Sequence, residues 1–188
     1  MLEAAYECIG RFGMGKTTID DVAKVSGVSR ATIYRLFPGG KEQLLRETVG
    51  WEMDRFFVRL GEAVVGAPDF PTLVEQALLF AHRAVREHEV LQKVLVTEPD
   101  RLLPLLTIES ERVDTAIANF VRPYLEAEHA EGQLRSGVDV DDAADWVARM
   151  TLSLIGSPGS SDLDDPDAVH RLVRTQLLGP VLVQDEPV

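Results

Sequence analysis

Cysteine, long apolar runs and strand-like alternation are all scarce in this 188-residue sequence. The single cysteine, Cys8, excludes an internal disulfide and indicates a reducing compartment. No apolar run reaches the ~18 residues of a membrane span, and no basic start leads into an apolar stretch, so we expect a cytoplasmic protein without a membrane partner. Apolar residues recur at helical spacing instead of alternating, which favours an all-α fold.

Basic residues are also in the minority. The 19 Lys and Arg residues face 31 Asp and Glu residues, which gives a net charge of −12. The distribution is uneven, because residues 1–48 hold seven basic and six acidic residues, whereas the other 140 residues hold twelve basic and 25 acidic. An acidic surface repels phosphate, so the amino-terminal segment is the only plausible face for a nucleic acid.

The segment Thr17–Phe37 predicts two short helices joined by a tight turn. Thr18 and Asp21 form a capping-box pattern at the start of the first helix, and Gly27 can adopt the positive φ of a sharp helix exit. Ser29 is placed to cap the second helix, in which we expect Ile33 and Leu36 to point inward. This pattern is typical of a helix-turn-helix that places its second helix in the major groove of DNA.

Helical periodicity continues along the chain, with about nine helices expected in total. The expected later helices run approximately over residues 41–65, 73–89, 90–97, 105–128, 139–155 and 166–178. Pro99 and Pro104 are expected to interrupt the chain before the fourth of these, and Gly179 and Pro180 to end the last. The tail from Val181 to Val188 is expected to be loose.

The run from Thr17 to Leu44, with its tyrosine followed by Phe-Pro-Gly-Gly-Lys-Glu-Gln-Leu, resembles the TetR family of bacterial transcriptional regulators. The resemblance implies a three-helix DNA-binding head at residues 1–46 and a helical ligand-binding and dimerisation domain at residues 47–188. It further implies a homodimer that binds double-stranded operator DNA. A small-molecule effector and repression of transcription are the expected mode of regulation.

The same resemblance assigns roles to residues of the head. Thr18, the Tyr34 hydroxyl and Lys41 would meet phosphates. Arg30, Thr32 and Arg35 would face bases, because arginine can bridge guanine and the threonine methyl can touch thymine. Ser29 and Ala31 would lie close enough for backbone or van der Waals contact.

The body offers a weaker prediction of an effector site. Aromatic residues and one histidine could line an apolar cavity, and ordinary core packing is the alternative for each of them. These residues are Phe56, Phe57, Phe80, His82, Phe120, Tyr124 and Trp146. The two helices expected at about 141–155 and 166–178 would pair with their copies as a four-helix dimer interface.

Two other function classes remain open at this point. The chain could be a helical protein-interaction module whose first segment binds protein. It could also be a nucleotide hydrolase, because Gly10–Thr17 matches the phosphate-loop pattern G-x-x-x-x-G-K-[ST] and would use Lys16. The helical spacing of Leu2–Ile9 disfavours the strand that a phosphate loop follows. Cys8 and the four histidines lack a metal-ligand spacing, so we expect no metal, no cofactor and no enzyme activity.

Overall fold

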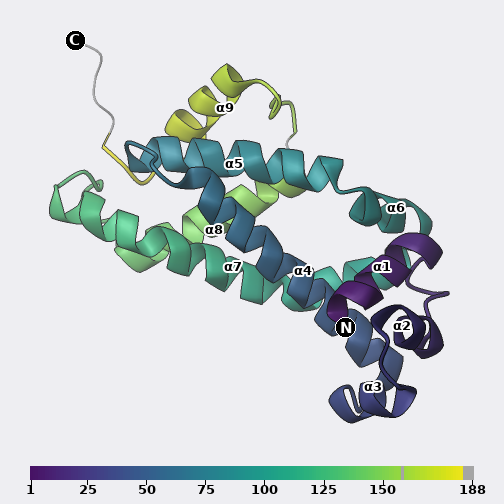
Figure 1. Ribbon diagram of the computed structural model, residues 1–188. Coiled ribbons are helices and arrows are strands. Elements are labelled where there is room, and N and C mark those ends of the chain that lie inside the picture. The colour runs from purple at the N-terminus through teal and green to yellow at the C-terminus, as the bar shows by residue number, and fades with distance from the viewer. Residues whose placement is uncertain (158, 184–188) are drawn as a thin grey trace. The chain divides into compact units, whose positions relative to one another are not determined.

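The computed structural model describes residues 1–157 and 159–183, without the side chains of residues 108 and 109. Within these residues the fold is all-α, as predicted, and an isolated bridge between Leu134 and Leu182 is the only strand-like pairing. Figure 1 shows the elements in chain order. They are α1 Leu2–Phe12, α2 Ile19–Ser26, α3 Arg30–Leu36, α4 Gly40–Val64, α5 Phe70–Glu87, α6 Glu89–Thr97, α7 Pro99–Ala130, α8 Val140–Gly156, α9 Pro166–Leu172 and the π-helical turn η1 Val173–Leu177.

The chain forms two compact units. Unit 1 comprises Met1–Arg59 and Val85–Glu109, and unit 2 comprises Leu60–Ala84 and Ser110–Val188. Unit 1 therefore contains α1, α2 and α3 together with most of α4, the end of α5, all of α6 and the beginning of α7. The functional division expected after residue 46 stays a prediction.

Local capping explains where α2 and α3 begin. The Thr18 hydroxyl accepts a hydrogen bond from the Asp21 amide (3.2 Å), and the Asp21 carboxylate accepts one from the Thr18 amide (3.1 Å), which completes the predicted capping box. These hydrogen bonds lower the pKa of Asp21, the Thr18 side chain having the largest effect. Gly27 ends α2 at φ 71°, and Ser29 caps α3 by accepting from the Thr32 amide (3.2 Å).

Helices α1, α2 and α3 and the beginning of α4 share a small apolar core in which Ile33 is completely buried. The core consists of Ala4, Ala5, Cys8, Ile19, Val22, Ile33, Phe37 and Leu44. The inward position predicted for Leu36 is wrong, because this side chain is 54% exposed and Phe37 is buried instead. A residue four positions along a helix lies about 40° from the first, and a residue three positions along lies about 60° away, so Phe37 continues the Ile33 face more closely.

A second apolar cluster of unit 1 joins parts that are distant in sequence. It consists of Ile9, Met14, Leu45, Val94 and Leu102, with partly buried residues of α6 and α7 packed against it. Met14 lies in the loop between α1 and α2 and is only 2% exposed. The loop that precedes α2 is therefore anchored in a core that α6 and the start of α7 help to build.

Unit 2 has a larger apolar core formed by α5, α7, α8, α9 and η1. The π-helical turn places both Leu177 and Leu178 in this core, where each is at most 1% exposed. The Trp146 indole donates to the Leu177 carbonyl (2.8 Å), which links α8 to this turn. A π-helical turn shifts the register of the residues that follow it, so two successive leucines can be buried here.

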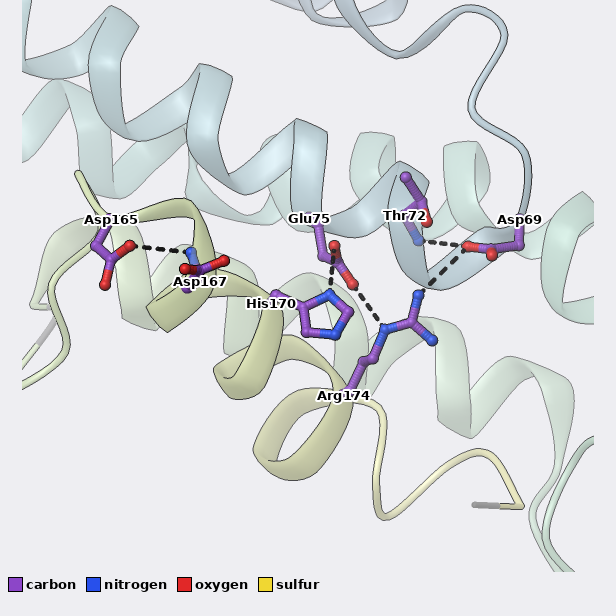
Figure 2. A network of polar contacts seen from close by, with 7 residues as sticks. All are labelled: Asp69, Thr72, Glu75, Asp165, Asp167, His170 and Arg174. Atoms are coloured by element: carbon purple, nitrogen blue, oxygen red, sulfur yellow. Dashed lines mark hydrogen bonds and ion pairs between the residues drawn. The ribbon is translucent and has the colours of Figure 1, made fainter. Parts of the chain in front are cut away.

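A polar network attaches α9 and η1 to α5, beside which α9 lies in Figure 1. Figure 2 shows Glu75 between His170 and Arg174, at 3.1 Å from His170 Nδ1 and 3.0 Å from Arg174 Nε. Asp69 lies at the start of α5, and its pKa is lowered, first by hydrogen bonding from the Thr72 side chain and also by the Thr72 amide and Arg174. These charged contacts fix the position of the last helix on α5.

Two expectations about the chain are wrong. α7 begins at Pro99 and runs through Pro104, because proline suits the first helical position and Pro104 removes only one hydrogen bond close to the helix start. Val181 and Leu182, placed in a loose tail from the sequence, are 3% and 9% exposed. The Arg135 amide donates to the Val181 carbonyl (2.9 Å), so backbone pairing holds this segment. Residues 184–188 lie outside the described residues.

Candidate nucleic-acid interface

Helix α3 exposes most of its side chains, among them the polar groups of Arg30, Tyr34 and Arg35. Ile33 is its one fully buried side chain, and Tyr34 is 47% exposed. Of the predicted base-facing and neighbouring residues, Ser29, Arg30, Ala31 and Arg35 are exposed and Thr32 is half-buried. A seven-residue helix that buries so little is held by its caps and by Ile33, and most of its other side chains are exposed.

Two of the predicted base-facing residues make contacts within the head. Arg30 Nε lies 3.0 Å from Asp20 Oδ1 on α2, and the two side chains are 61% and 53% exposed. Thr32 Oγ1 and Ser29 Oγ lie 3.0 Å apart and share a hydrogen bond. Because an exposed ion pair is worth only about 0.2–1 kcal/mol, Asp20 orients Arg30 without preventing it from binding elsewhere.

The residues predicted to meet phosphates are distributed over three elements. Thr18 is exposed at the start of α2, where its own side chain is engaged in the capping box. Tyr34 on α3 lies near Gly40, the first residue of α4. Lys41 is half-buried, and its ammonium donates to the Gly15 carbonyl (2.7 Å). The phosphate contact assigned to Lys41 stays a prediction, and the sequence did not indicate this internal contact.

The stretch that matches the phosphate-loop pattern has a different structure. Gly10 lies inside α1, so a helix and not a strand precedes the loop. The Gly15 amide donates to Glu98 Oε2 (2.6 Å), and a Cβ added at Gly13 would overlap the same carboxylate. A carboxylate of the chain itself thus occupies the position where a phosphate loop binds an anion, which disfavours a nucleotide at this site.

The cysteine of the head lies in an apolar environment. Cys8 is fully buried in the apolar core, and burial raises the pKa of its thiol. A buried thiol with a raised pKa is a poor nucleophile and ligand. Among the described residues, no group of three or more His, Cys, Asp or Glu side chains is arranged to hold a metal ion. In the same part of the chain, no helix is long and apolar enough to cross a membrane.

The residues predicted to line an effector cavity are divided between the two units. Phe56 and Phe57 form an edge-to-face pair in unit 1, with ring centroids 5.5 Å apart. The other five belong to unit 2: Phe80, His82, Phe120, Tyr124 and Trp146.

Within unit 2, several of these residues contact other side chains. Tyr124 stacks on Phe70 (6.1 Å) and contacts Phe120 (5.9 Å), whereas His82 Nε2 lies 3.6 Å from Asp164 Oδ1. Phe120 and Trp146 are half-buried against the unit 2 core. Core packing therefore accounts for several of these positions, and their contact with an effector stays a prediction.

Asp114 on α7 was missed in the sequence. Its Oδ1 atom is buried and has no hydrogen-bond partner among the described residues. It lies four residues before Ala118, and Val121 and Leu125 continue the same buried stripe. The interruption of an apolar stripe by a carboxylate was a readable signal of an unusual buried polar group.

Comparisons with known proteins agree with this geometry. Residues 1–48 match the model of the bacterial regulatory proteins of the tetR family. An uncharacterized HTH-type transcriptional regulator of Mycobacterium tuberculosis is 26% identical over 192 residues, which cover 95% of this chain and 92% of that protein. A second uncharacterized HTH-type regulator, YhgD of Bacillus subtilis, is 23% identical over 155 residues, covering 82% and 80% of the two chains.

Solved structures show the same fold over almost the whole chain. The transcriptional repressor QsdR of R. erythropolis, from the TetR family, aligns with a TM-score of 0.62 at 18% identity, covering 100% of this chain and 95% of that one. A structure described as a TetR-family transcriptional regulator from Mesorhizobium loti aligns with a TM-score of 0.67 at 16% identity, covering 97% and 95%.

The capped helix-turn-helix with its exposed polar helix defines a DNA-binding regulatory protein. Residues 1–48 match the TetR family of bacterial transcriptional regulators, and over most of its length the chain is similar to HTH-type transcriptional regulators.

Proposed function

We propose that this regulator binds a palindromic operator as a homodimer, represses transcription, and releases the operator when a small molecule binds to its body. The polar face of α3 is the observation that carries this proposal, because Ile33 anchors the helix while Arg30, Tyr34 and Arg35 remain exposed. Exposed arginine and phenol groups on a short helix suit a major groove and its flanking phosphates. Thr18 and Lys41 would add phosphate contacts on either side.

The proposed dimer would form through α8 and the segment comprising α9 and η1. Two copies of each would make a four-helix interface with two-fold symmetry. The two α3 helices would then read half-sites whose centres are about 34–36 Å apart, or a multiple of that distance. Separate heads on a flexible connection would not fix such a spacing.

The proposed effector would bind in the body, at residues 47–188, and change the head separation through α4. A coupling free energy of about 1–3 kcal/mol would alter operator affinity by about 5–150-fold. Native mass spectrometry of the purified protein is the direct test of an effector, since a co-purifying small molecule appears as a mass adduct. A cytoplasmic location follows from this role.

Fluorescence anisotropy with DNA that flanks its own gene tests the proposal. We expect saturable binding of one dimer per site, with affinity that falls steeply between about 50 and 200 mM salt. Scrambled DNA of the same length should bind much more weakly. The absence of salt-dependent binding, or equal binding to scrambled DNA, would contradict operator recognition.

The alternative is a helical module whose first segment binds another protein. It predicts that Arg30→Ala and Tyr34→Ala leave charge-dependent elution from immobilised DNA unchanged. The operator proposal predicts earlier elution of both variants, because each removes a group from the α3 face.

A further inference from the structure

We propose that Glu98, at the junction of α6 and α7, is a positioning residue for DNA recognition, acting through the Gly15 backbone and Lys41. This inference rests on the proposed binding of DNA by α3. Glu98 lies 83 residues from Gly15 in the sequence and outside the segment that matches the family's DNA-binding domain. All of the contacts described below lie within unit 1.

The first contact is the hydrogen bond from the Gly15 amide to Glu98 Oε2, at 2.6 Å. The Glu98 side chain is only 21% exposed, and Arg101 Nε lies 3.7 Å from the same oxygen. A hydrogen bond to a carboxylate that is shielded from water is stronger than one between neutral groups. Glu98 therefore fixes the orientation of the peptide unit that enters Gly15.

The second contact is on the other side of the same residue. The Lys41 ammonium donates to the Gly15 carbonyl at 2.7 Å, so Gly15 lies between a negative and a positive side chain. Lys41 belongs to the first turn of α4, next to Gly40, which lies against Tyr34. Through Gly15, Glu98 thus affects the start of the helix that follows the recognition helix.

The same loop leads directly into α2. The buried Thr17 hydroxyl donates to the Gly13 carbonyl (2.7 Å), and the next residue, Thr18, caps α2. Lys93 of α6 strengthens the arrangement by donating to the Gly10 carbonyl (2.7 Å) at the end of α1. The loop is therefore held at both ends, and its path determines where α2 presents its amino terminus.

The direction of the change in DNA affinity distinguishes a positioning role of Glu98 from the effect of its negative charge alone. Removing an acidic side chain from an acidic protein should tighten DNA binding, because repulsion of phosphate decreases. If Glu98 positions the interface, Glu98→Ala should instead weaken operator binding, by about tenfold for the loss of a charge-assisted hydrogen bond. Binding to scrambled DNA, which depends less on geometry, should stay within about twofold of wild type.

The experiment compares full-length variants by anisotropy with an operator selected in vitro by the wild-type protein. Glu98→Gln keeps an acceptor oxygen and should recover binding to within about threefold of wild type. Glu87→Gln removes an exposed charge of unit 1 elsewhere and should not weaken binding. Gly15→Ala should reproduce the Glu98→Ala defect, because its Cβ would lie 2.8 Å from Glu98 Oε2 and displace the carboxylate.

The double variant Gly15→Ala/Glu98→Ala should bind no more weakly than Glu98→Ala, since both changes break the same contact. Additive losses would overturn the proposal, as would unchanged or tighter operator binding by Glu98→Ala. An equal loss on operator and scrambled DNA, accompanied by a large drop in melting temperature, would also overturn it.

The Gly15 amide provides a readout that needs no DNA. Its NMR signal should lose protection from hydrogen exchange in Glu98→Ala and retain it in Glu98→Gln. If the amide behaves in this way and the wild-type protein selects no DNA, the proposed function fails and the positioning role fails with it. If the wild type selects an operator and the amide is unprotected, only the Glu98 proposal fails.

Discussion

Replacing Arg30 with alanine should weaken operator binding while leaving folding nearly intact. In the free protein, the contact that fixes Arg30 is the ion pair with Asp20 at 3.0 Å, whose members are both more than half exposed. Such a pair contributes about 0.2–1 kcal/mol, whereas a bidentate arginine contact to guanine contributes about 1–3 kcal/mol. The net loss for Arg30→Ala is therefore about 1–2 kcal/mol, or about 5–30-fold in affinity.

The complementary change is Asp20→Asn, which removes the competing carboxylate. With Arg30 released, binding to non-operator DNA should tighten, and the slope of log K against log salt should steepen by about 0.9 for one additional phosphate contact. Glu3→Gln is the matched control, because it removes one exposed charge from α1 of the same head.

Anisotropy titrations at several salt concentrations, paired with thermal melts, measure both effects. The reasoning is refuted if Arg30→Ala binds the operator as tightly as wild type, or if its binding loss is matched by a loss of several kcal/mol in unfolding free energy. It is also refuted if Glu3→Gln and Asp20→Asn change the salt slope equally.

Three further predictions concern stability. Ile33→Ala should lower the unfolding free energy of the head by about 2–5 kcal/mol, because the side chain is fully buried, and circular dichroism melts would reveal the loss. Asp114→Leu should raise the melting temperature by about 2–4 °C per kcal/mol gained, since it removes a buried oxygen without a partner; an unchanged or lower value in calorimetry would contradict this. Asp69, whose folded pKa is lowered mainly by Thr72, stabilises the fold above its unfolded pKa of about 3.9, and this contribution is lost as pH falls through the folded pKa. The melting temperature of Asp69→Asn should therefore lie below that of the wild type at neutral pH, and the two values should converge in acid.

Local chemistry made the head predictable from sequence. Thr18, Asp21, Gly27 and Ser29 act on backbone groups within three residues of themselves, so their spacing determines where α2 and α3 begin and end. The all-α fold followed in the same way from the helical spacing of apolar residues. Leu36 was the exception, because the choice between it and Phe37 depends on packing.

Contacts between distant segments were not predictable in this way. Nothing near Glu98 in the sequence indicates that it accepts a hydrogen bond from Gly15, and the Gly-Met-Gly-Lys run gave a misleading match to a phosphate loop. The buried segment after Pro180 likewise depends on pairing with Arg135, 46 residues before Val181. Such contacts arise from tertiary packing, which overrides local signals.

The aromatic residues of the body show a further limit. Composition identified Phe120, Tyr124 and Trp146 as cavity candidates, but the same side chains also suit an ordinary helical core. Periodicity cannot separate these roles, because both require an apolar face at the same spacing. Asp114 was the more informative position on α7, since a buried carboxylate oxygen without a partner is unusual in a core.

The most direct test of base reading by α3 is the operator preference of Arg35→Ala, determined by in vitro selection beside the wild-type protein. Arg35 is exposed on the polar face of α3 and is predicted to contact a base. The variant should lose its preference at one symmetric pair of positions and keep the rest of the motif. Identical motifs for the two proteins, or no enriched motif for either, would contradict base reading by α3.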